Sequence, residues 1–600
     1  MATETTPAHG GASFLTTPAG SDSVFAPEAF SDEQRMMAQT AHSFMAGEVT
    51  PLAERIDAQE PGLMRSLVEK SGQLGLLSAD VPEEYGGLGA GLTVSTILAD
   101  YLSGEASYGV AWGAHTTIGT LPIVLFGTPE QKATWLPDMA TGKIVGSYAL
   151  TEPGAGSDAM GIKTRAVRDG DSYVINGQKQ WISNSGFADV MIAFAKVDET
   201  KHTAFIVPYK TPGVSLGAEE KKMGIKGSST RAVYFDNARV PAGNVLGEVG
   251  KGHKIAFNIL NIGRLKLGAS NGGGCREVIG ICAQYVTQRK AFGKTLAQFG
   301  LIQKKLAQMV VETYAAEAVN YRTAGLIEEA LGKAPDRSPD SALKAIEEFA
   351  MECSICKVLG SEVLGRTVDE GVQIFGGYGF MHEYAVEKAY RDARITRIFE
   401  GTNEINRLLL TGTLFKRAMA GRISVMDAFP EIEAAIAERR TPSVDVPEEL
   451  RFAAEAVERA KAATAYVLMK AGMRYMTEIE QEQEFLAAGA DMLINLFAMD
   501  SAVARAAAAL RAGSSDAGRH ALAARLSVWR FLPGVTQAIA DVLENLAVDA
   551  VSAGERDDEL ARLRAYLGDY HLASTPALRD LATTVIGRGS YPFSVVDERR

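Results

Sequence analysis

The residues with the clearest chemical potential are Glu400-Gly401-Thr402-Asn403, which follow a helical pattern that ends near Phe399. A glycine beside a carboxylate lets the backbone and a ligand approach closely. This arrangement suits a general base whose neighbouring N–H groups also hold the substrate. The alternative is that Glu400 only forms an ion pair with Arg391, Arg394 or Arg397. Those arginines are more simply interpreted as a solvated or interdomain face, so the pattern favours the base.

Length and composition set the frame for such a site. The chain has 600 residues and 64.0 kDa, too much for one core, so we expect three or four domains. An apolar content of 46% with 22% charged residues is typical of a soluble globular protein. The net charge of −12 and the pI of about 5.4 argue against nucleic acid as a partner.

Targeting and cysteine signals point to a reducing compartment. No apolar run is long enough to suggest a membrane span, and no arginine or apolar signal core precedes Arg35. We therefore expect a cytoplasmic protein. Four cysteines do not make a disulfide framework in a chain of this length. The pair Cys353-x-x-Cys356 could bind a metal or do redox work, but no second ligand pair accompanies it. Buried packing is the favoured interpretation, and no metal site is expected.

The pattern along the chain predicts an α+β protein that is mainly α. Helical periodicity dominates both ends, whereas the middle holds short β-branched and aromatic runs separated by turn pairs such as Asn176-Gly177. That middle part is typical of a small antiparallel barrel or sandwich. We expect an extended arm (1–30), an N-terminal helical domain (31–143), a β domain (144–248), a four-helix bundle (249–415), a linker (416–445) and a helical tail (446–600).

Local signals refine these domains. Ser31 and Gln34 form a predicted capping box at the start of the first helix. The glycine run at 81–89 lacks dinucleotide-loop spacing and follows no strand, so it predicts a loop between helices. In the tail, breaks between helices are predicted at 513–516, at Pro533-Gly534 and at Gly554.

Five separated motifs resemble the acyl-CoA dehydrogenase family, and the resemblance covers about residues 30–415. They are YALTEPGAGSD at 148–158, NGQKQWIS at 176–183, QRKAFG at 288–293, QIFGGYG at 373–379 and the Glu400 segment. The helical tail, together with Gly113-Ala-His115 and Leu125-Phe-Gly-Thr128, is similar to the very-long-chain branch of that family.

The resemblance implies FAD as the cofactor. The implied flavin contacts are Tyr148, Leu150, Thr151, Gly156, Ser157, Trp181, Ile182, Ser183, Arg289, Phe292, Gln303, Gln373, Ile374, Gly376, Gly377, Thr402 and Glu404. Arginine suits a pyrophosphate because its fork binds two oxygens at once. Without the motifs around them, Trp181 would be a core aromatic and Gly376-Gly377 an ordinary helix end. In the family the 373–377 loop reaches the flavin of the neighbouring subunit, which implies a homodimer.

The implied reaction removes hydrogens from the α and β carbons of an acyl-CoA thioester. Glu400 takes the α proton, and Ser157, Asn261, Arg264 and Gly401 are implied substrate contacts. A buried Arg264 needs an anionic or carbonyl partner, the alternative being a surface salt bridge. Some branches place the base one residue before the equivalent of Arg264, but Gly263 cannot act. Glu404 departs from relatives with a neutral residue there.

Chain length and partners follow from the resemblance in outline. Small residues at Gly113 and Ala114 imply a deep acyl cavity and a long-chain substrate, although the adjacent Trp112 could block it. The implied electron acceptor is an electron-transfer flavoprotein. The alternatives are an acyl-CoA oxidase that uses oxygen and a non-catalytic assembly factor. The tail is expected to pack on the dimer where a second dimer lies in tetrameric relatives.

The linker raises a separate membrane hypothesis. Lys416, Arg417 and Arg422 flank apolar residues, a pattern that can lie on a membrane surface. Glutamates at 431, 433 and 438 oppose that interpretation. The apolar residues in question are Ile423, Val425, Met426 and Phe429.

Overall fold

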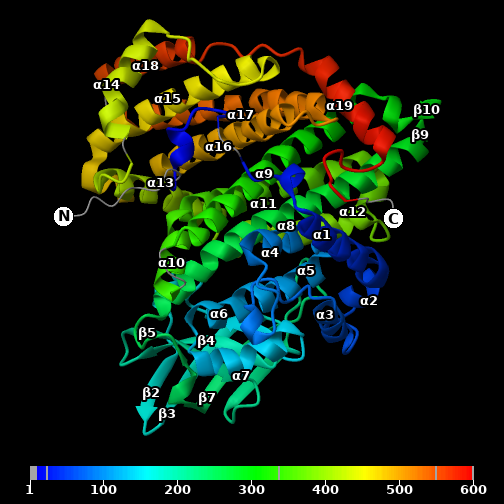
Figure 1. The fold of residues 1–600 in the computed structure, drawn as a ribbon, viewed down its shortest axis with the longest axis vertical. Helices are drawn as coiled ribbons and strands as arrows, with labels where there is room; N and C mark the ends of the chain where they lie inside the picture. Colours follow the sequence, from blue (N-terminus) through cyan, green and yellow to red (C-terminus); the bar gives the residue numbers. More distant parts are fainter. Residues whose placement is uncertain (1–9, 22–23, 335–337, 424, 547–549, 597–600) are drawn as a thin grey trace.

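The computed structural model describes residues 10–21, 24–334, 338–423, 425–546 and 550–596. Four layers follow one another in Figure 1: the β domain, the N-terminal helices, the long bundle helices and, above them, the tail helices. The predicted fold class is confirmed, since helices dominate and the strands are confined to the middle domain and one short hairpin.

The N-terminal domain is a set of short helices that pack against the bundle. They are α1 (Asp32–Phe44), α2 (Ala53–Asp57), α3 (Leu63–Gln73), α4 (Gly91–Tyr101), α5 (Ala106–Gly113), α6 (Leu121–Phe126) and α7 (Pro129–Ala140). The capping box is confirmed: Ser31 Oγ accepts from the Gln34 N–H, and Gln34 Oε1 accepts from the Ser31 N–H. The glycine run at 81–89 forms the predicted loop before α4. A π-helical stretch, Ala114–Thr120, joins α5 to α6.

The β domain contains β1 (Gly146–Ala149), β2 (Arg165–Asp169), β3 (Ser172–Ser183), β4 (Val190–Val197), β5 (Lys201–Pro208), β6 (Val214–Glu219), β7 (Thr230–Pro241) and β8 (Val245–Leu246). The strand order is β6-β7-β3-β2-β4-β5-β8, with β1 also paired to β4. Contrary to the prediction, the sheet is not wholly antiparallel. Both β1 and β2 run parallel to β4, at different points along it, and neither is joined to β4 directly, because β3 lies between β2 and β4 in the chain.

The bundle is built from α8 (Gly252–Gln288), α9 (Gly300–Gly332), α11 (Ala350–Phe375) and α13 (Asn403–Met419). The shorter α10 (Pro339–Glu348) and α12 (Ala385–Ala393) flank these helices. A small hairpin of β9 (Lys290–Ala291) and β10 (Lys294–Thr295) separates α8 from α9. All four cysteines are buried, and no group of metal-ligating side chains occurs among the described residues. Packing, the favoured interpretation of Cys353 and Cys356, is confirmed.

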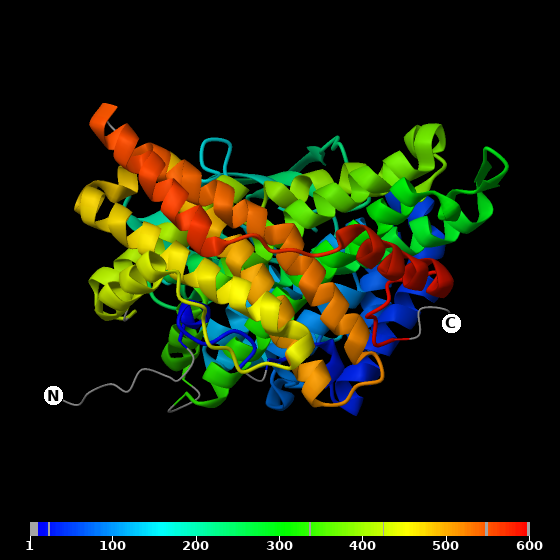
Figure 2. The ribbon, with the colours of Figure 1, turned by 90° about the horizontal axis from the view of Figure 1, so that it is seen from above.

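The tail comprises α14 (Val425–Glu438), α15 (Arg451–Tyr475), α16 (Gln483–Arg511), α17 (Ala517–Leu546), α18 (Ala550–Leu567) and α19 (Ser574–Arg588). Seen from above, these helices cover the bundle, and α19 returns to lie along it (Figure 2). The predicted break at 513–516 is confirmed, but those at Pro533-Gly534 and Gly554 are wrong. α17 continues through Pro533 because its buried face packs on α16, and a Cβ at Gly534 would meet Asn495 at 2.7 Å.

The described part of the N-terminal arm does not extend into solvent. Its residues are packed between the bundle and the tail (Figure 2). The centre of the Phe14 ring lies 4.5 Å from that of Phe497. The Ala12 N–H donates to Glu352 Oε1 at 2.6 Å, and Lys461 Nζ donates to the Thr17 carbonyl at 2.6 Å. The arm therefore ties α11 to α15.

The expected linker contains α14, which packs on α15. Ile423 is buried, and the Phe429 ring stacks on Tyr466 at 5.5 Å. These two apolar side chains face the protein, which removes half of the apolar set that motivated the membrane hypothesis. The side chains of Val425 and Met426 lie outside the described residues.

Two helical stretches among the described residues are long and apolar enough to span a membrane, contrary to the expectation from sequence: 106–126 and 483–511. Their apolar windows are 61% and 83% buried inside the protein. Core helices of soluble proteins meet the same criteria, so burial accounts for both.

Candidate active site

Glu400 lies in a loop where two successive residues have a positive φ angle. Its φ is +59°, and that of Gly401 is +79°. We call residues 399–402 the base loop; it connects a short 3₁₀ turn, Arg394–Arg397, to α13. The side chain of Glu400 faces Gly263 on α8, where an added Cβ would lie 2.8 Å from Glu400 Oε2. Gly263 is therefore not only unable to act as a base but also makes the space that the base occupies.

Three side chains hold the base loop by its carbonyl oxygens. Arg264 Nε donates to the Glu400 carbonyl at 3.2 Å, and Lys357 Nζ donates to the Gly401 carbonyl at 2.7 Å. Asn406 Nδ2 lies 3.3, 3.0 and 3.0 Å from the carbonyls of residues 400, 401 and 402. Thr402 Oγ1 caps α13 by accepting from the Ile405 N–H at 3.2 Å. These side chains thus fix the loop through its backbone carbonyls, and the Glu400 carboxylate is left available to a substrate.

The electrostatics suit a base at neutral pH. Burial raises the pKa of Glu400 to about 7, against the opposing effect of the Arg264 and Lys357 charges. Glu400 Oε2 is buried and has no hydrogen-bond partner among the described residues. The Tyr148 hydroxyl is also buried without a hydrogen-bond partner among the described residues. Burial, and to a smaller extent the Glu400 charge, raises the pKa of Tyr148 well above its usual value. Buried polar groups without partners are rare and indicate a place for a ligand.

The alternative role for Glu400, an ion pair with neighbouring arginines, is not what the structure shows. Arg391 Nε binds Glu387 at 2.6 Å, while Arg394 and Arg397 are exposed. The latter two line a cleft of about 750 Å³ together with Thr402 and Glu404.

A largely apolar cavity of about 120 Å³ reaches Glu400. Gly113 and Ala114 line it from one side, Gly263 from another, and Ser183 of β3 borders it beside Glu400. Trp112 also lines the cavity, but its indole N–H donates to the Leu76 carbonyl at 2.9 Å, which fixes the ring in the wall. A Cβ added at Gly113 would have no atom within 4 Å. The space beside Gly113 is therefore open to a ligand.

A buried ion pair aligns the two segments of the β domain that border the site. Lys179 Nζ binds Glu152 Oε1 at 2.7 Å and donates to the Leu150 carbonyl at 3.2 Å. The Gln180 N–H donates to the Thr151 carbonyl at 2.9 Å. Residues 150–152 and 179–181 are thereby held side by side.

The predicted cofactor residues pass a test of fit. Trp181 is 61% exposed with a φ of +56°, so it is not the core aromatic that the alternative required. No atom of the described chain lies within 4 Å of a Cβ added at Gly156, Gly376 or Gly377. At Gly376 the backbone demands glycine, because this residue ends α11 with a φ of +63°, as the helix-end alternative required. Neither packing nor a positive φ demands glycine at Gly156 or Gly377, whereas close approach of a flat ligand would. These surfaces fit a bound flavin.

The predicted flavin contacts differ in what they can offer a cofactor. Leu150, Ile182 and Ile374 are buried in hydrophobic clusters, so they can offer only backbone atoms. By contrast, Gly156, Ser157, Gln373 and Glu404 are exposed. Arg264 is 4% exposed and also binds Asn261 Oδ1 at 3.0 Å, so the surface salt bridge is excluded and the carbonyl partner is found.

The predicted cofactor residues fall into two groups. One group surrounds the base loop. The other lies at the far end of α8, where the Arg289 guanidinium sits 5.2 Å from the centre of the Tyr378 ring and Phe292 is 94% exposed. Gln303 joins that end, donating to the Ala297 carbonyl at 2.9 Å. Gly263 and Gln288 are about 37 Å apart along α8, since a helix rises ~1.5 Å per residue. One chain does not bring the two groups together.

Sequence reasoning missed Lys357 and Asn406. Lys357 is fully buried on α11, and Asn406 on α13 is equally inaccessible. A signal for Lys357 was present: a single lysine stands in the apolar stretch Ser354-Ile-Cys-Lys357-Val-Leu, and a buried charge needs a partner. The partner, a backbone carbonyl, could not be found from sequence.

Comparison with known proteins gives the same domain series. The N-terminal domain of acyl-CoA dehydrogenase matches residues 31–143, and the middle domain matches 147–238. Two descriptions of the acyl-CoA dehydrogenase C-terminal domain match residues 250–415 and 459–562. The second of these lies in the tail.

Individual relatives cover most of the chain. A probable acyl-CoA dehydrogenase of Bacillus subtilis (strain 168) is 44% identical over 565 residues, 93% of both chains. The very long-chain specific acyl-CoA dehydrogenase of human mitochondria is 38% identical over 474 residues, 74% of this chain and 70% of the relative. A crystal structure of an acyl-CoA dehydrogenase complexed with FAD from Bacillus anthracis has a TM-score of 0.94 and 43% identity, covering 97% of this chain and 100% of that one.

Proposed function

Because the chain belongs to the acyl-CoA dehydrogenase family, we propose that it oxidises long-chain acyl-CoA thioesters to trans-2-enoyl-CoA with FAD as its cofactor. Electrons then pass to an electron-transfer flavoprotein, and the reaction belongs to fatty acid β-oxidation. The observation that carries this proposal is the base loop, which presents a buried carboxylate oxygen, without a partner among the described residues, to a largely apolar cavity.

The residues of this chain supply proton removal and positioning. Glu400 takes the α proton, and its raised pKa makes it a stronger base than an exposed glutamate. The Glu400 N–H is the donor that the resemblance assigns to the thioester oxygen; one such donor is worth ~3 kcal/mol of transition-state stabilisation. Bound FAD would accept the β hydrogen with its electron pair. Tyr148, Thr151, Trp181 and Ser183 would hold the flavin.

A homodimer would complete the cofactor site. The second group of residues, around Arg289 and Gly376-Gly377, lies too far along α8 to reach the flavin of the same chain. Large exposed apolar side chains accompany it, namely Phe292 at 94% and Phe380 at 79%. In a dimer this end of one subunit would bind the flavin held beside the base loop of the other.

The long-chain preference rests on Gly113. We expect the purified yellow protein to bleach anaerobically with long-chain acyl-CoA faster than with butyryl-CoA. Leucine at Gly113 should fill the open side of the cavity and reverse that order. Gly412 provides a matched control, since it is also a helical glycine with no atom within 4 Å of an added Cβ. Leucine there should leave the order unchanged.

The same bleaching assay distinguishes the dehydrogenase from the two alternative functions, an oxidase and an assembly factor. Absence of bleaching with every chain length would reject the dehydrogenase and favour an assembly factor. Hydrogen peroxide formed at the rate of turnover would identify an oxidase. Reduction of an added electron-transfer flavoprotein at that rate supports the proposal.

A further inference from the structure

Lys357 is a buried cation to which the steps of the proposed reaction assign no part. It is fully buried on α11, and burial lowers its pKa to about 7. Its Nζ donates to the Gly401 carbonyl at 2.7 Å and to Asn403 Oδ1 at 2.6 Å. An ammonium group with so little solvation is retained only where its interactions compensate for the loss of water.

The conformation that Lys357 holds is an unfavourable one. A positive φ at a non-glycine residue such as Glu400 costs ~1–3 kcal/mol and persists only where the surroundings impose it. Arg264 and Asn406 share the task, and Arg264 contacts the loop through the Glu400 carbonyl. Lys357 links the Gly401 carbonyl to Asn403 at the start of α13, and Asn403 in turn bonds Ser361 Oγ at 3.1 Å.

We propose that Lys357 is a positioning residue for the reaction: its ammonium group clamps the base loop through the Gly401 carbonyl and places a positive charge behind Glu400. The inference rests on the proposed function of Glu400 as the base. It extends that function to a residue that touches neither the carboxylate nor, by its burial behind the loop, the substrate.

The charges around the pair fix the direction of the effect. Glu400 is faced by Arg264 from α8, Lys357 from α11 and Tyr148 from β1. Lys357 itself is influenced by Glu400, Arg264, Glu404 and Glu362. The Lys357 charge lowers the pKa of Glu400, so its removal raises that pKa and leaves less carboxylate at neutral pH.

The test uses Lys357→Met in the flavin-loaded full-length protein. Protonation of Glu400 is followed, without turnover, as the carboxylic acid C=O band in infrared difference spectra against Glu400→Gln. We expect the midpoint to rise by at least one pH unit relative to the wild type. We also expect bleaching at pH 7 to slow at least tenfold, with flavin content retained.

Lys461→Met is the matched control. Lys461 is also buried, at 3% exposure, and donates to a backbone carbonyl, but it lies in the tail. This variant should lose thermal stability and keep the Glu400 midpoint. If Lys357→Met does not fold, Lys357→Gln takes its place, because it keeps an N–H donor without the charge. Lys357→Arg should restore most of the midpoint.

An unchanged midpoint in the neutral variants would overturn the proposal, as would an equal shift in Lys461→Met. Failure of the proposed function has a different signature: the wild type would not bleach, while the infrared midpoints would still report on the influence of Lys357.

Discussion

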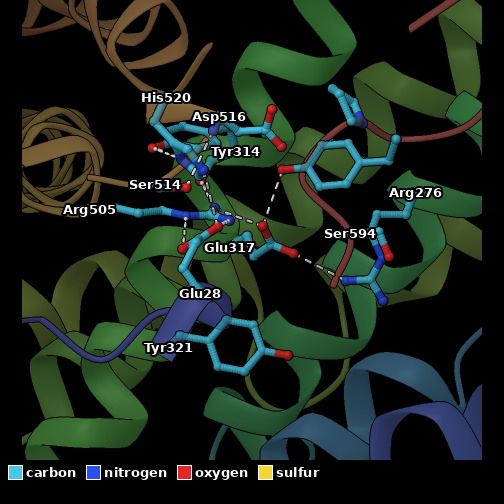
Figure 3. A network of polar contacts seen from close by, with 12 residues as sticks. Glu28, Arg276, Tyr314, Glu317, Tyr321, Arg505, Ser514, Asp516, His520 and Ser594 are labelled. Carbon is cyan, nitrogen blue, oxygen red and sulfur yellow. Dashed lines mark hydrogen bonds and ion pairs between the residues drawn. The ribbon is translucent and has the colours of Figure 1, made fainter. Parts of the chain in front are cut away.

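Glu400 and Glu317 show opposite ways of keeping a carboxylate oxygen away from solvent inside this protein. Glu317 lies in the middle of α9, where Arg505 Nη1 binds it at 2.7 Å and Arg276 Nη1 at 3.2 Å (Figure 3). The Tyr591 hydroxyl also donates to Glu317, at 3.2 Å. Glu400 lies in the base loop, where its φ is positive, and its Oε2 has no hydrogen-bond partner among the described residues. The cations near Glu400 bind its backbone loop and not its carboxylate.

The pairing around Glu317 joins distant parts of the chain. Arg505 of the tail also binds Glu28 of the N-terminal arm at 2.6 Å (Figure 3). Tyr591 follows α19 in the C-terminal segment. Such a fully paired cluster fixes how the arm, bundle and tail fit together. Ion pairing of the Glu317 carboxylate therefore serves to hold the domains together, whereas a carboxylate whose residue is held through its backbone keeps its lone pairs for a substrate proton.

The largest expected effect is that of Glu400→Gln. Loss of a general base costs on the order of 10²–10⁴-fold, so the anaerobic bleaching rate should fall about a thousandfold. At pH 8 the ionised Glu400 destabilises the fold, because its folded pKa is raised, and the neutral amide removes that cost. The melting temperature should be unchanged or higher. Retained bleaching would disprove the role of Glu400.

Glu317→Gln should have the opposite effect, a loss of stability without a loss of activity. Removing one member of a buried charge cluster costs on the order of 3–5 kcal/mol of unfolding free energy. Arg505 keeps Glu28 and Arg276 keeps Asp100, so we expect about 3 kcal/mol. Denaturant unfolding measures the loss, and the bleaching rate per bound flavin should not change. A slower rate at full flavin content would show that the two regions are coupled.

Gly263→Ala tests the space that the base needs. The new Cβ would lie 2.8 Å from Glu400 Oε2, so the carboxylate must move. Misplacement by about 1 Å can cost ~10²-fold, and we expect a 10–100-fold slower rate. Gly280→Ala on the same helix has no atom within 4 Å and serves as the control. Equal rates in both variants would contradict the predicted contact.

The smallest expected effect is that of pH. The base acts as carboxylate, and its pKa is about 7. The bleaching rate should fall about tenfold for each pH unit below 7 and level off above it. Stopped-flow bleaching from pH 5.5 to 9 measures this dependence. Glu317→Gln should keep the midpoint, and a shifted midpoint there would assign the titration to the wrong glutamate.

Local signals predicted local structure well. The Ser31–Gln34 capping box and the loop at 81–89 appear as expected, because both depend on residues within a few positions of each other. The breaks at Pro533 and Gly554 do not appear. Proline and glycine disfavour a helix locally. However, α17, which contains Pro533, packs its apolar face along α16, and α18, which contains Gly554, packs on α17 and α15, so packing outweighs the local preference.

The site was predictable only in part. The motif residues around Glu400 could be named from sequence, and the structure places Tyr148, Ser183 and Arg264 beside it. Lys357 and Asn406 could not, because their role is to bind backbone carbonyls, which carry no residue identity. The separation of the Arg289 group from the base loop also required the straight length of α8.

The sequence by itself determined the chemistry: a glutamate next to glycine, a glycine at the rival base position and a helical protein with one β domain. Only the tertiary structure decided which buried charges are paired. Pairing depends on which atoms meet when helices from distant parts of the chain pack together, and a buried carboxylate gains or loses its reactivity by those contacts. Glu317 and Glu400 are the same residue type, and the fold made one of them an anchor and the other a base.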